Sequence, residues 1–451
     1  MNKNKRQDEI LKKSLMVYGL GRVGISLARF LVRKGVSVIA FDDNQKVKDN
    51  PEVKELNHYH NFKLVEDINH VKPDMVICSP GIRSDAPLIE KIIKNRIPLI
   101  DEIEFTSYFI DKPIIAITGT NGKSTTTALI GTILEADQKN VFYGGNLAPG
   151  LPFSTTLLDK EKDIYVIEVS SFQLERCYDF SPKIALLLNI TEDHFDRHQS
   201  KKEYISLKFR IFNKQNETDF AIVNFDDPTI MTNIAKIHSP ITYFSTEESV
   251  DGAYCQDYLI YFKNEVICST DAIRIKGKHN LKNVLAAVCA AKISGVKNNI
   301  IESTLSSFTG LPHRLELVRE LNGVKYINNS MCTNPDAAIN SLEAISTPVI
   351  IITGGKEKNL VIDDYIKVIA KRAKYAILIG ENRNRLSTEL EKIKFDQKEV
   401  ADSLENAVSS ARAKAVKGDT VLFSPGFASF DSYTNFMERG KAFCNAVSNL
   451  T

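Results

Sequence analysis

The feature that most constrains this chain is a glycine-rich loop directly after a short apolar run. Residues 114–126 read IIAITGTNGKSTT. The apolar run is typical of a buried parallel strand, and Gly119 and Gly122 let backbone amides turn inward around phosphate oxygens. Lys123 would then reach the β- and γ-phosphates, and the Ser124 hydroxyl would hold Mg²⁺ at the start of a helix. A strand, two glycines, Lys-Ser and a helix in that order predict an ATP site rather than a chance glycine-rich turn.

Length, charge and cysteine usage set bounds on the rest of the chain. A chain of 451 residues predicts two or three domains, each able to bury its own core. Its 58 basic and 56 acidic side chains give a net charge of +2, which favours neither nucleic acid nor an acidic membrane as a partner. No apolar run is as long as a membrane span, and the first residues lack the apolar core of a secretion signal. The seven cysteines are scattered without a CxxC pair, which indicates reduced thiols in a cytoplasmic protein.

A second glycine-rich loop, GLGRVG at residues 19–24, follows an apolar run at 15–18 and precedes an apolar helix pattern. The next strand ends at Asp42, where a dinucleotide-binding fold places an acid against a ribose hydroxyl. The same glycines serve any nucleotide diphosphate at a helix N-terminus. We therefore predict a nucleotide-diphosphate site, with the turn at 79–81 on the same sheet edge, and keep NAD as the weaker alternative.

Two buried-strand patterns, at residues 163–171 and 183–190, follow the phosphate loop and end in polar groups. Glu168 closes the first, where a carboxylate near a phosphate-loop Mg²⁺ is expected. The polar run TEDHFDRH at 191–198 follows the second, and such a cluster straight after a strand usually marks a site. Farther on, GKHNLKN at 277–283 leads into a small-residue helix, whose first amides could face an adenine.

The last third of the chain carries strand patterns at residues 348–355, 375–381 and 419–426, with amphipathic stretches between them. Each strand runs into a turn, so polar loops gather at one edge of a sheet. The predicted fold class is α/β with three domains: a Rossmann-like N-terminal domain, a central P-loop ATPase-type domain with a parallel sheet, and a Rossmann-like C-terminal domain. The predicted domain boundaries are 1–111, 112–310 and 311–451.

Together these motifs resemble the ATP-dependent Mur ligases of peptidoglycan precursor synthesis, and most closely their D-glutamate-adding branch. The resemblance runs from about residue 14 to the last helix. The phosphate loop and the TEDH-type cluster mark the superfamily, which also includes folylpolyglutamate synthetase. The D-glutamate branch is indicated by IEVSSFQLE at 167–175 and by SPGFASFDSYTNFMERG at 424–440. Other matching segments are GGN at 144–146, HNLKN at 279–283 and GLPHRLE at 310–316.

The resemblance implies a ligase in which ATP activates a carboxylate. The substrate carboxylate attacks the γ-phosphate and forms an acyl phosphate, and the amine of D-glutamate then displaces phosphate from it. A protein promotes the phosphoryl transfer by neutralising charge on the phosphate oxygens. By similarity, the catalytic residues are Lys123, Glu168, His194 and Lys208. Mg²⁺ would be held by Ser124, Glu168, His194 and Lys208, with Lys208 as a carbamate that offers the hard oxygen donors this ion prefers. From its sequence context alone, Lys208 is a surface lysine of a helix.

The resemblance also assigns binding partners and residues. The implied substrates are UDP-N-acetylmuramoyl-L-alanine and D-glutamate, the implied cofactors are ATP and Mg²⁺, and the protein is expected to be a monomer. The implied ATP-binding residues are Gly119, Thr120, Asn121, Gly122, Lys123, Ser124, Thr125, Asn280, Asn283 and Arg314. The implied substrate-binding residues are Gly21, Arg22, Val23, Asp42, Ser79 and Gly81 for the UDP end, Asn146, Ser170 and Gln173 near the Mg²⁺ and the muramoyl-alanine end, and Lys358, Ser429 and Phe436 for D-glutamate.

One segment departs from the family pattern. After the strand at residues 324–328 the family expects Asp-Ser-Lys-x-Thr-Asn, whereas this chain reads NSMCTN, with Asn329 for the aspartate and Met331 for the lysine. Loss of a cation beside nucleotide phosphates weakens transition-state stabilisation unless another group replaces it, and Lys356 is the candidate. Three hypotheses remain open: an active D-glutamate ligase, a ligase with a different amino-acid acceptor, and a weakened homologue that still binds nucleotide and UDP-sugar. We favour the first because the rest of the catalytic set is in place.

Overall fold

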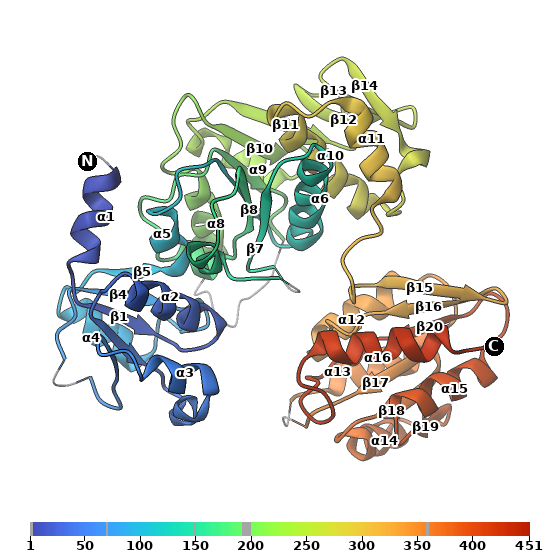
Figure 1. Cartoon of the computed structure of the whole chain (residues 1–451). Coiled ribbons are helices and arrows are strands. Elements are labelled where there is room, and N and C mark those ends of the chain that lie inside the picture. The colour runs from blue at the N-terminus through green and yellow to red at the C-terminus, as the bar shows by residue number, and fades with distance from the viewer. Residues whose placement is uncertain (1–2, 69–70, 148–149, 192–199, 358–359) are drawn as a thin grey trace. The chain divides into compact units, whose positions relative to one another are not determined.

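The computed structural model describes residues 3–68, 71–147, 150–191, 200–357 and 360–451, and Figure 1 shows its helices and strands. The chain divides into two compact units, Met1–Phe308 and Thr309–Thr451. Within the described residues the first unit contains two sheets and the second unit one. No helix in these ranges is long and apolar enough to cross a membrane.

The first sheet is centred on β1, whose four side chains are all buried. Its strands are parallel and follow the order β3-β2-β1-β4-β5. The apolar face of α2 packs on it, with Leu27 and Leu31 fully buried. The elements of this part are α1 (Lys3–Leu11), β1 (Leu15–Tyr18), α2 (Arg22–Arg33), β2 (Val38–Phe41), η1 (Gln45–Asp49), α3 (Pro51–Leu56), β3 (Phe62–Leu64), β4 (Met75–Cys78), α4 (Pro87–Lys94), β5 (Leu99–Asp101) and α5 (Glu102–Ser107).

The middle sheet follows the order β14-β13-β12-β11-β10-β9-β6-β8-β7 among the described residues. β6 (Ile114–Thr118) lies between β8 (Ile164–Glu168) and β9 (Ile184–Leu187), and all three strands are parallel and buried. The strands from β7 to β12 pair in parallel, whereas β12, β13 and β14 form an antiparallel extension. The other elements are α6 (Lys123–Ala136), β7 (Val141–Gly145), η2 (Phe153–Leu158), α7 (Ser171–Leu174), α8 (Lys201–Phe209), η3 (Arg210–Phe212), β10 (Phe220–Asn224), α9 (Pro228–Thr232), η4 (Ile234–Lys236), β11 (Ile241–Ser245), β12 (Gly252–Gln256), β13 (Leu259–Phe262), β14 (Glu265–Ser269), η5 (Thr270–Ala272), α10 (Lys278–Ile293) and α11 (Asn298–Ser307).

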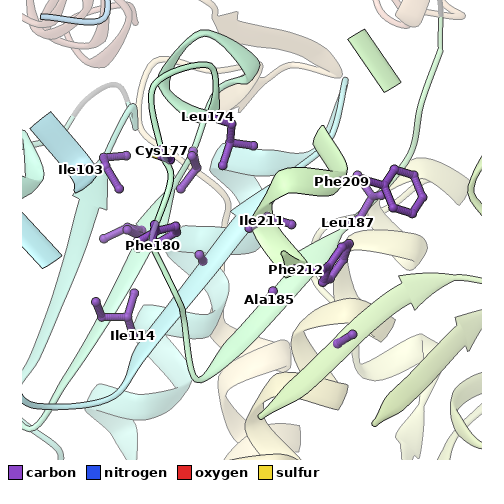
Figure 2. Packing of buried hydrophobic residues seen from close by; sticks show 14 of the residues in the cluster. Ile103, Ile114, Leu174, Cys177, Phe180, Ala185, Leu187, Phe209, Ile211 and Phe212 are labelled. Carbon is purple, nitrogen blue, oxygen red and sulfur yellow. The ribbon is translucent and has the colours of Figure 1, made fainter. Parts of the chain in front are cut away.

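The core of the middle sheet fixes α8 in place. Figure 2 shows Ala185 and Leu187 of β9 in the same cluster as Phe209, Ile211 and Phe212, which come from the end of α8 and the turn after it. Full burial of a large apolar side chain stabilises a fold by about 1.5–3 kcal/mol. Because Phe209 directly follows Lys208, this packing also determines where the Lys208 side chain lies.

The helix α5, which links the first sheet to the middle one, is held by a buried carboxylate. Glu104 accepts hydrogen bonds from three successive backbone amides, those of Tyr178 (3.2 Å), Asp179 (2.8 Å) and Phe180 (2.8 Å). It also accepts one from the Tyr108 hydroxyl (2.5 Å). Burial raises the pKa of Glu104 above its usual value despite these bonds. The carboxylate therefore ties the linker helix to the loop after α7.

The second unit contains one sheet in the order β15-β16-β20-β17-β18-β19 within the described residues. β15 and β16 are antiparallel, and the other neighbours are parallel. The loops after β16, β17 and β20 therefore meet at the carboxyl edge of the sheet. The elements are β15 (Glu316–Leu321), β16 (Val324–Asn328), α12 (Pro335–Ala344), β17 (Val349–Gly354), α13 (Asp363–Arg372), β18 (Ala373–Ile379), α14 (Arg383–Lys392), β19 (Lys398–Val400), α15 (Leu404–Lys414), β20 (Thr420–Phe423) and α16 (Phe436–Ser448).

The predicted α/β class is confirmed, with a largely parallel sheet in each of the three predicted regions. The sequence patterns did not predict the antiparallel strands β12–β14, whose buried and exposed side chains do not alternate regularly, or the three-residue edge strands β3, β5 and β19. The units separate after Phe308, near the predicted boundary at 310; the boundaries 1–111, 112–310 and 311–451 themselves stay predictions.

Candidate functional site

The phosphate loop joins β6 to α6 and is shaped by glycines with positive φ. Gly119 has φ +155° and Gly122, the residue before the helix, has φ +85°. A Cβ atom on Gly122 would lie 2.1 Å from Oδ1 of Asn283, so α10 approaches the loop at a point where only glycine fits. The hydrogen-bond ladder of α6 begins with the amide of Thr126 bonded to the carbonyl of Gly122. The amides ahead of Thr126 lie outside this ladder, which is the position where helices bind anions.

The loop takes its shape from Asn189, which follows β9. Its side-chain Oδ1 accepts from the amide of Asn121 (2.8 Å), and its Nδ2 donates to the carbonyl of the same residue (3.0 Å). Its own carbonyl accepts from the amide of Thr120 (3.0 Å). The first half of the loop is therefore bonded to the neighbouring strand end, and the amides at the start of α6 are those placed to meet a phosphate.

Two lysines converge on the loop carbonyls. Lys123 Nζ donates to the carbonyls of Gly119 (3.0 Å) and Thr120 (2.8 Å). Lys208 Nζ donates to the same Gly119 carbonyl (2.8 Å), and its side chain is only 2 % exposed. One turn earlier on α8, the Tyr204 hydroxyl contacts Thr120 Oγ1 (3.0 Å). The interpretation of Lys208 as a surface lysine from its sequence context is wrong, because the packing of α8 against β9 turns it inward.

Glu168 supplies a buried carboxylate at the end of β8, beside Ile117 of β6. Asn146 Nδ2 donates to Oε1 (3.0 Å), whereas Oε2 has no hydrogen-bond partner among the described residues. The residue is 3 % exposed. A buried, unpartnered carboxylate oxygen is costly and calls for a further partner. With the buried hydroxyl of Ser124 at the start of α6, it offers the hard oxygen donors that Mg²⁺ prefers.

The two remaining predicted metal ligands are His194 and Lys208. His194 lies outside the described residues. Lys208 carries an amine that donates to a carbonyl, so it would become a ligand only as the predicted carbamate. Residues that fit Mg²⁺ are thus present at the phosphate loop, and the full ligand set Ser124, Glu168, His194 and Lys208 stays a prediction.

The segment after Glu168 begins with a helix cap. Ser170 Oγ accepts from the amide of Gln173 (3.3 Å), and Gln173 Oε1 accepts from the amide of Ser170 (2.9 Å), which is a capping box at the start of α7. Gln173 is buried at 2 % exposure. The side chains of Ser170 and Gln173 thus form hydrogen bonds within the start of α7. The contact of these two residues and of Asn146 with the muramoyl-alanine end stays a prediction.

The N-terminal part of α10 faces the phosphate loop. Asn283 is buried and donates from Nδ2 to Oδ1 of Asn280 (3.3 Å), and Asn280 donates to the carbonyl of Lys276 (2.9 Å). Figure 1 shows α10 beside α6 on the middle sheet. This brings two of the predicted ATP residues next to the loop; the adenine contact itself, and the contact predicted for Arg314, stay predictions.

The glycine-rich loop of the first sheet is tied to the neighbouring strand ends. Asp42 Oδ2 accepts from the amide of Leu20 (2.6 Å), and Oδ1 accepts from that of Asn44 (2.8 Å). Ser79 Oγ donates to the carbonyl of Gly19 (2.8 Å). Asp42 and Ser79 thus hold the loop in shape. Contact with the UDP end of a substrate stays a prediction for Gly21, Arg22, Val23, Asp42, Ser79 and Gly81.

The sequence patterns missed Arg176, which joins the middle sheet to the first one. It is 4 % exposed and follows α7. Its guanidinium donates to the carbonyl of Ile82 (3.3 Å from Nη2) and to Ser84 Oγ (3.1 Å), in the loop that begins at Ser79. The residues next to Arg176 in the sequence do not predict this role, because its hydrogen-bond partners are about ninety residues earlier in the chain.

In the second unit, the predicted D-glutamate residues lie on the loop between β20 and α16. Ser429 is 2 % exposed, and its carbonyl accepts from the amide of Tyr433 (2.9 Å). Phe436 is the first residue of α16 and is partly buried. Lys358 lies outside the described residues. Beside this loop is a cavity of about 480 Å³ that is lined by Gly355, Lys356 and Arg439, among others.

The hypothesis that Lys356 replaces the missing lysine stays a prediction. Its Nζ lies 2.7 Å from Oε2 of Glu381, at the end of β18, and this hydrogen bond raises the pKa of Lys356. Asn329 instead faces a polar network: Nδ2 donates to Ser341 Oγ (2.7 Å) and Ser424 Oγ (3.2 Å), and Oδ1 accepts from the amide of Leu315 (3.2 Å). The asparagine is therefore matched to its surroundings as an amide.

We expect Asn329→Asp to destabilise the second unit by about 1–3 kcal/mol, because a buried carboxylate cannot make the two donations of the amide. Calorimetric unfolding of the full chain would measure this. Asn322→Asp, the same change on an exposed turn, is the control and should have little effect. Equal stability of the two variants would show that the network does not select asparagine. Adding Met331→Lys to the Asn329→Asp variant should restore part of the lost stability, because the lysine returns a cation that can balance the charge of the new carboxylate.

A histidine, a carboxylate and a thiol also come together in the second unit: His313, Glu316 and Cys444. The amide nitrogen of Asn328 lies among them, 2.8 Å from His313 Nδ1, 3.2 Å from Glu316 Oε2 and 3.3 Å from Cys444 Sγ. The position that an ion would need is therefore taken by a side-chain amide. Burial lowers the pKa of His313, which favours the neutral ring that accepts this hydrogen bond.

Comparison with known proteins decides the family. Three family models match in chain order: "Mur ligase MurD-like, N-terminal domain" at residues 13–101, "Mur ligase middle domain" at 117–291, and "Mur ligase, glutamate ligase domain" at 313–427. The chain belongs to the Mur ligase family. Each match lies within one of the three predicted domain ranges, and the resemblance drawn from the motifs is confirmed.

Curated Mur ligases of one kind resemble this chain along almost its whole length. The UDP-N-acetylmuramoylalanine–D-glutamate ligase of Caldanaerobacter subterraneus subsp. tengcongensis is 37% identical over 449 residues, which cover 98% of this chain and 99% of that protein. The ligase of the same name from Thermoanaerobacter pseudethanolicus is 38% identical over 453 residues, with the same coverage.

Solved Mur ligase structures share the fold. UDP-N-acetylmuramate-alanine ligase MurC from Thermotoga maritima has a TM-score of 0.58 at 17% identity, covering 97% of this chain and 99% of that one. MurF ligase from the same organism, solved in complex with ADP, has a TM-score of 0.56 at 17% identity, covering 96% and 94%. At such identities the likeness concerns the fold alone.

Proposed function

We propose that this chain is an ATP-dependent ligase that adds D-glutamate to UDP-N-acetylmuramoyl-L-alanine during peptidoglycan precursor synthesis. The choice of substrates rests on the curated relatives of that name, which match all three regions of the chain. The observation that carries the chemistry is the convergence of Lys123, Glu168 and Lys208 on one phosphate loop.

The reaction forms one amide bond at the expense of ATP. An oxygen of the substrate carboxylate attacks the γ-phosphorus, the bond to the bridging oxygen breaks, and ADP leaves. The amine nitrogen of D-glutamate then attacks the carbonyl carbon of the acyl phosphate, inorganic phosphate leaves, and the nitrogen loses a proton. Negative charge builds up on the phosphoryl oxygens in the first step, so that step gains most from positive groups already in place.

The residues of the phosphate loop supply that positive charge. Lys123 exchanges its hydrogen bonds to the loop carbonyls of Gly119 and Thr120 for phosphate oxygens, which accept charge-assisted hydrogen bonds more strongly. The amides at the start of α6 bind the same phosphates. Asn189 keeps the loop open in this shape, so the protein need not rearrange when the nucleotide enters.

Ser124, Glu168, His194 and a carbamylated Lys208 would hold Mg²⁺. When bound, the ion neutralises charge on the phosphate and carboxylate oxygens. Asn146 orients Glu168 through its hydrogen bond to Oε1, and Oε2, which has no hydrogen-bond partner among the described residues, would be available to hold the ion. Carbamylation would convert the Lys208 amine, which now donates to Gly119, into an anionic oxygen ligand.

The two other substrates are assigned by similarity. The UDP end lies on the loop of residues 19–24 and the turn that begins at Ser79, and D-glutamate lies near Lys358, Ser429 and Phe436 in the second unit. A cytoplasmic location and a monomeric state stay predictions, as does the choice of D-glutamate over another amino acid.

Phosphate release from ATP, measured with UDP-N-acetylmuramoyl-L-alanine and a panel of amino acids, tests the proposal. We expect release that requires both the UDP-substrate and D-glutamate. Release with a different amino acid would favour the alternative acceptor. ATP binding without release for any amino acid would favour the weakened homologue, which the altered residues Asn329 and Met331 motivate.

A further inference from the structure

Arg439, on the first turns of α16, is a buried cation that the proposed reaction does not use. Its side chain is 2 % exposed, and no carboxylate of the described residues forms an ion pair with it within 4.0 Å. Burial lowers the pKa of Arg439 to about 10, so the guanidinium is still charged at neutral pH. Keeping such a charge in the interior is costly unless it is satisfied by well-placed hydrogen bonds.

The hydrogen bonds of Arg439 join two separate loops. Nε donates to Ser330 Oγ (3.1 Å), and Nη2 donates to the carbonyl of the same serine (2.9 Å). Nη1 donates to the carbonyl of Phe427 (2.9 Å). Ser330 belongs to the loop after β16 and stands between Asn329 and Met331, whereas Phe427 belongs to the loop after β20. A planar fork with several donors can span two loops in this way, and a lysine cannot.

The same cluster reaches the residues assigned to D-glutamate. Ser330 Oγ donates to the carbonyl of Phe436 (2.8 Å), and Phe427 lies two residues before Ser429. The loop after β17, which leads to Lys358, is also in contact: a Cβ atom on Gly355 would lie 3.2 Å from Nη1 of Arg439 and 2.5 Å from the carbonyl of Ala428. Three loops of the carboxyl edge therefore pack around one guanidinium.

We propose that Arg439 is a positioning residue for the D-glutamate site. It holds the loops after β16 and β20 at a fixed separation, so that Ser429 and Phe436 keep the geometry needed to bind the amino acid. The inference rests on the proposed function and adds a residue to it. Arg439 also anchors the loop after β16 at Ser330, between the positions where this chain has lost the aspartate and the lysine of the family pattern.

Arg319 offers a matched control within the same unit. Its Nη1 donates to the carbonyls of Val447 (3.3 Å), Ser448 (3.2 Å) and Leu450 (2.8 Å), at the opposite end of α16. Like Arg439, Arg319 donates hydrogen bonds to backbone carbonyls near this helix. Those carbonyls belong to residues that are not part of the proposed site. Loss of the Arg319 guanidinium should lower stability without a selective change in the KM of any one substrate.

The test compares the variants R439K and R319K of the full chain in steady-state phosphate release, with each substrate varied in turn. A displacement of about 1 Å in positioned groups costs about 10²-fold, and lysine keeps part of the contact. We therefore expect R439K to raise KM for D-glutamate roughly ten- to hundredfold, with KM for ATP and for the UDP-substrate within about twofold of native. R319K should leave all three values unchanged.

The result that would overturn the inference is an unchanged KM for D-glutamate in R439K, or an equal change for all three substrates, as a merely structural role predicts. If R439K does not fold, Ser330→Ala removes the hydroxyl shared by Arg439 and Phe436, and KM for D-glutamate should rise in the same selective way. Native protein without D-glutamate-dependent release would overturn the proposed function and this inference together. An active native enzyme with an unaffected R439K would overturn only the inference.

Discussion

Replacing Glu168 with glutamine is expected to lower the rate of ligation by about 10²- to 10³-fold, while the ligand-free protein keeps its unfolding temperature. The amide oxygen of glutamine can still accept from Asn146, so the hydrogen bond to Oε1 is kept. What disappears is the negative charge of the carboxylate, whose buried Oε2 has no hydrogen-bond partner in the described part of the chain. Phosphate release and thermal unfolding with and without ATP and Mg²⁺ measure the two effects.

The matched control is Glu135→Gln on α6, because this carboxylate is exposed and belongs to the same part of the chain. We expect native activity in that variant, and native stabilisation by ATP with Mg²⁺. If Glu168→Gln were stabilised by the nucleotide and Mg²⁺ as strongly as the native protein, Glu168 would not be a ligand of the ion.

Replacing Lys208 with alanine is expected to remove nearly all ligation while ATP binding remains largely intact, because a carbamate at this position would order Mg²⁺ for phosphoryl transfer rather than hold the adenine. The change also deletes the hydrogen bond to the Gly119 carbonyl. Phosphate release and nucleotide binding, measured on the same preparation, separate the two functions. Full activity of Lys208→Ala would refute the carbamate assignment.

Carbon dioxide provides a second test of the carbamate assignment. A carbamate forms reversibly from the amine and carbon dioxide, so the native enzyme should lose activity in buffer depleted of carbon dioxide and regain it when bicarbonate is added. Lys202→Ala, an exposed lysine on the same helix, should behave like the native protein. Native activity that does not respond to carbon dioxide would count against the carbamate. The variant Lys208→Ala would then decide whether the unmodified lysine is needed for ligation.

The parts of the site that could be predicted from the sequence are those built from consecutive residues. The phosphate loop is local: its strand, glycines, lysine and helix follow one another, and the structure has them at β6 and α6. The position of Glu168 could also be predicted, because it ends a buried strand and parallel strands end at one edge of the sheet.

The parts that could not be predicted depend on contacts between distant segments. Lys208 reads as a surface lysine because α8 shows little apolar periodicity, and only its packing against β9 turns the side chain inward. Arg439 makes two of its hydrogen bonds to Ser330, 109 residues earlier. Lys356 shows the same dependence: its Nζ lies 2.7 Å from Oε2 of Glu381, beyond the neighbouring strand, and its role as a replacement cation stays a prediction.

The hydrogen bonds of Asn189 have a consequence for how the first unit responds to its ligand. The loop conformation that receives phosphate exists only when the end of β9 is docked beside β6, and Tyr204 and Asn283 add the same requirement for α8 and α10. Nucleotide therefore binds an assembled sheet, not a separable loop. By linkage, a ligand at a hundred times its Kd adds about 2.7 kcal/mol to the free energy of unfolding, and that energy is shared by every segment that shapes the loop.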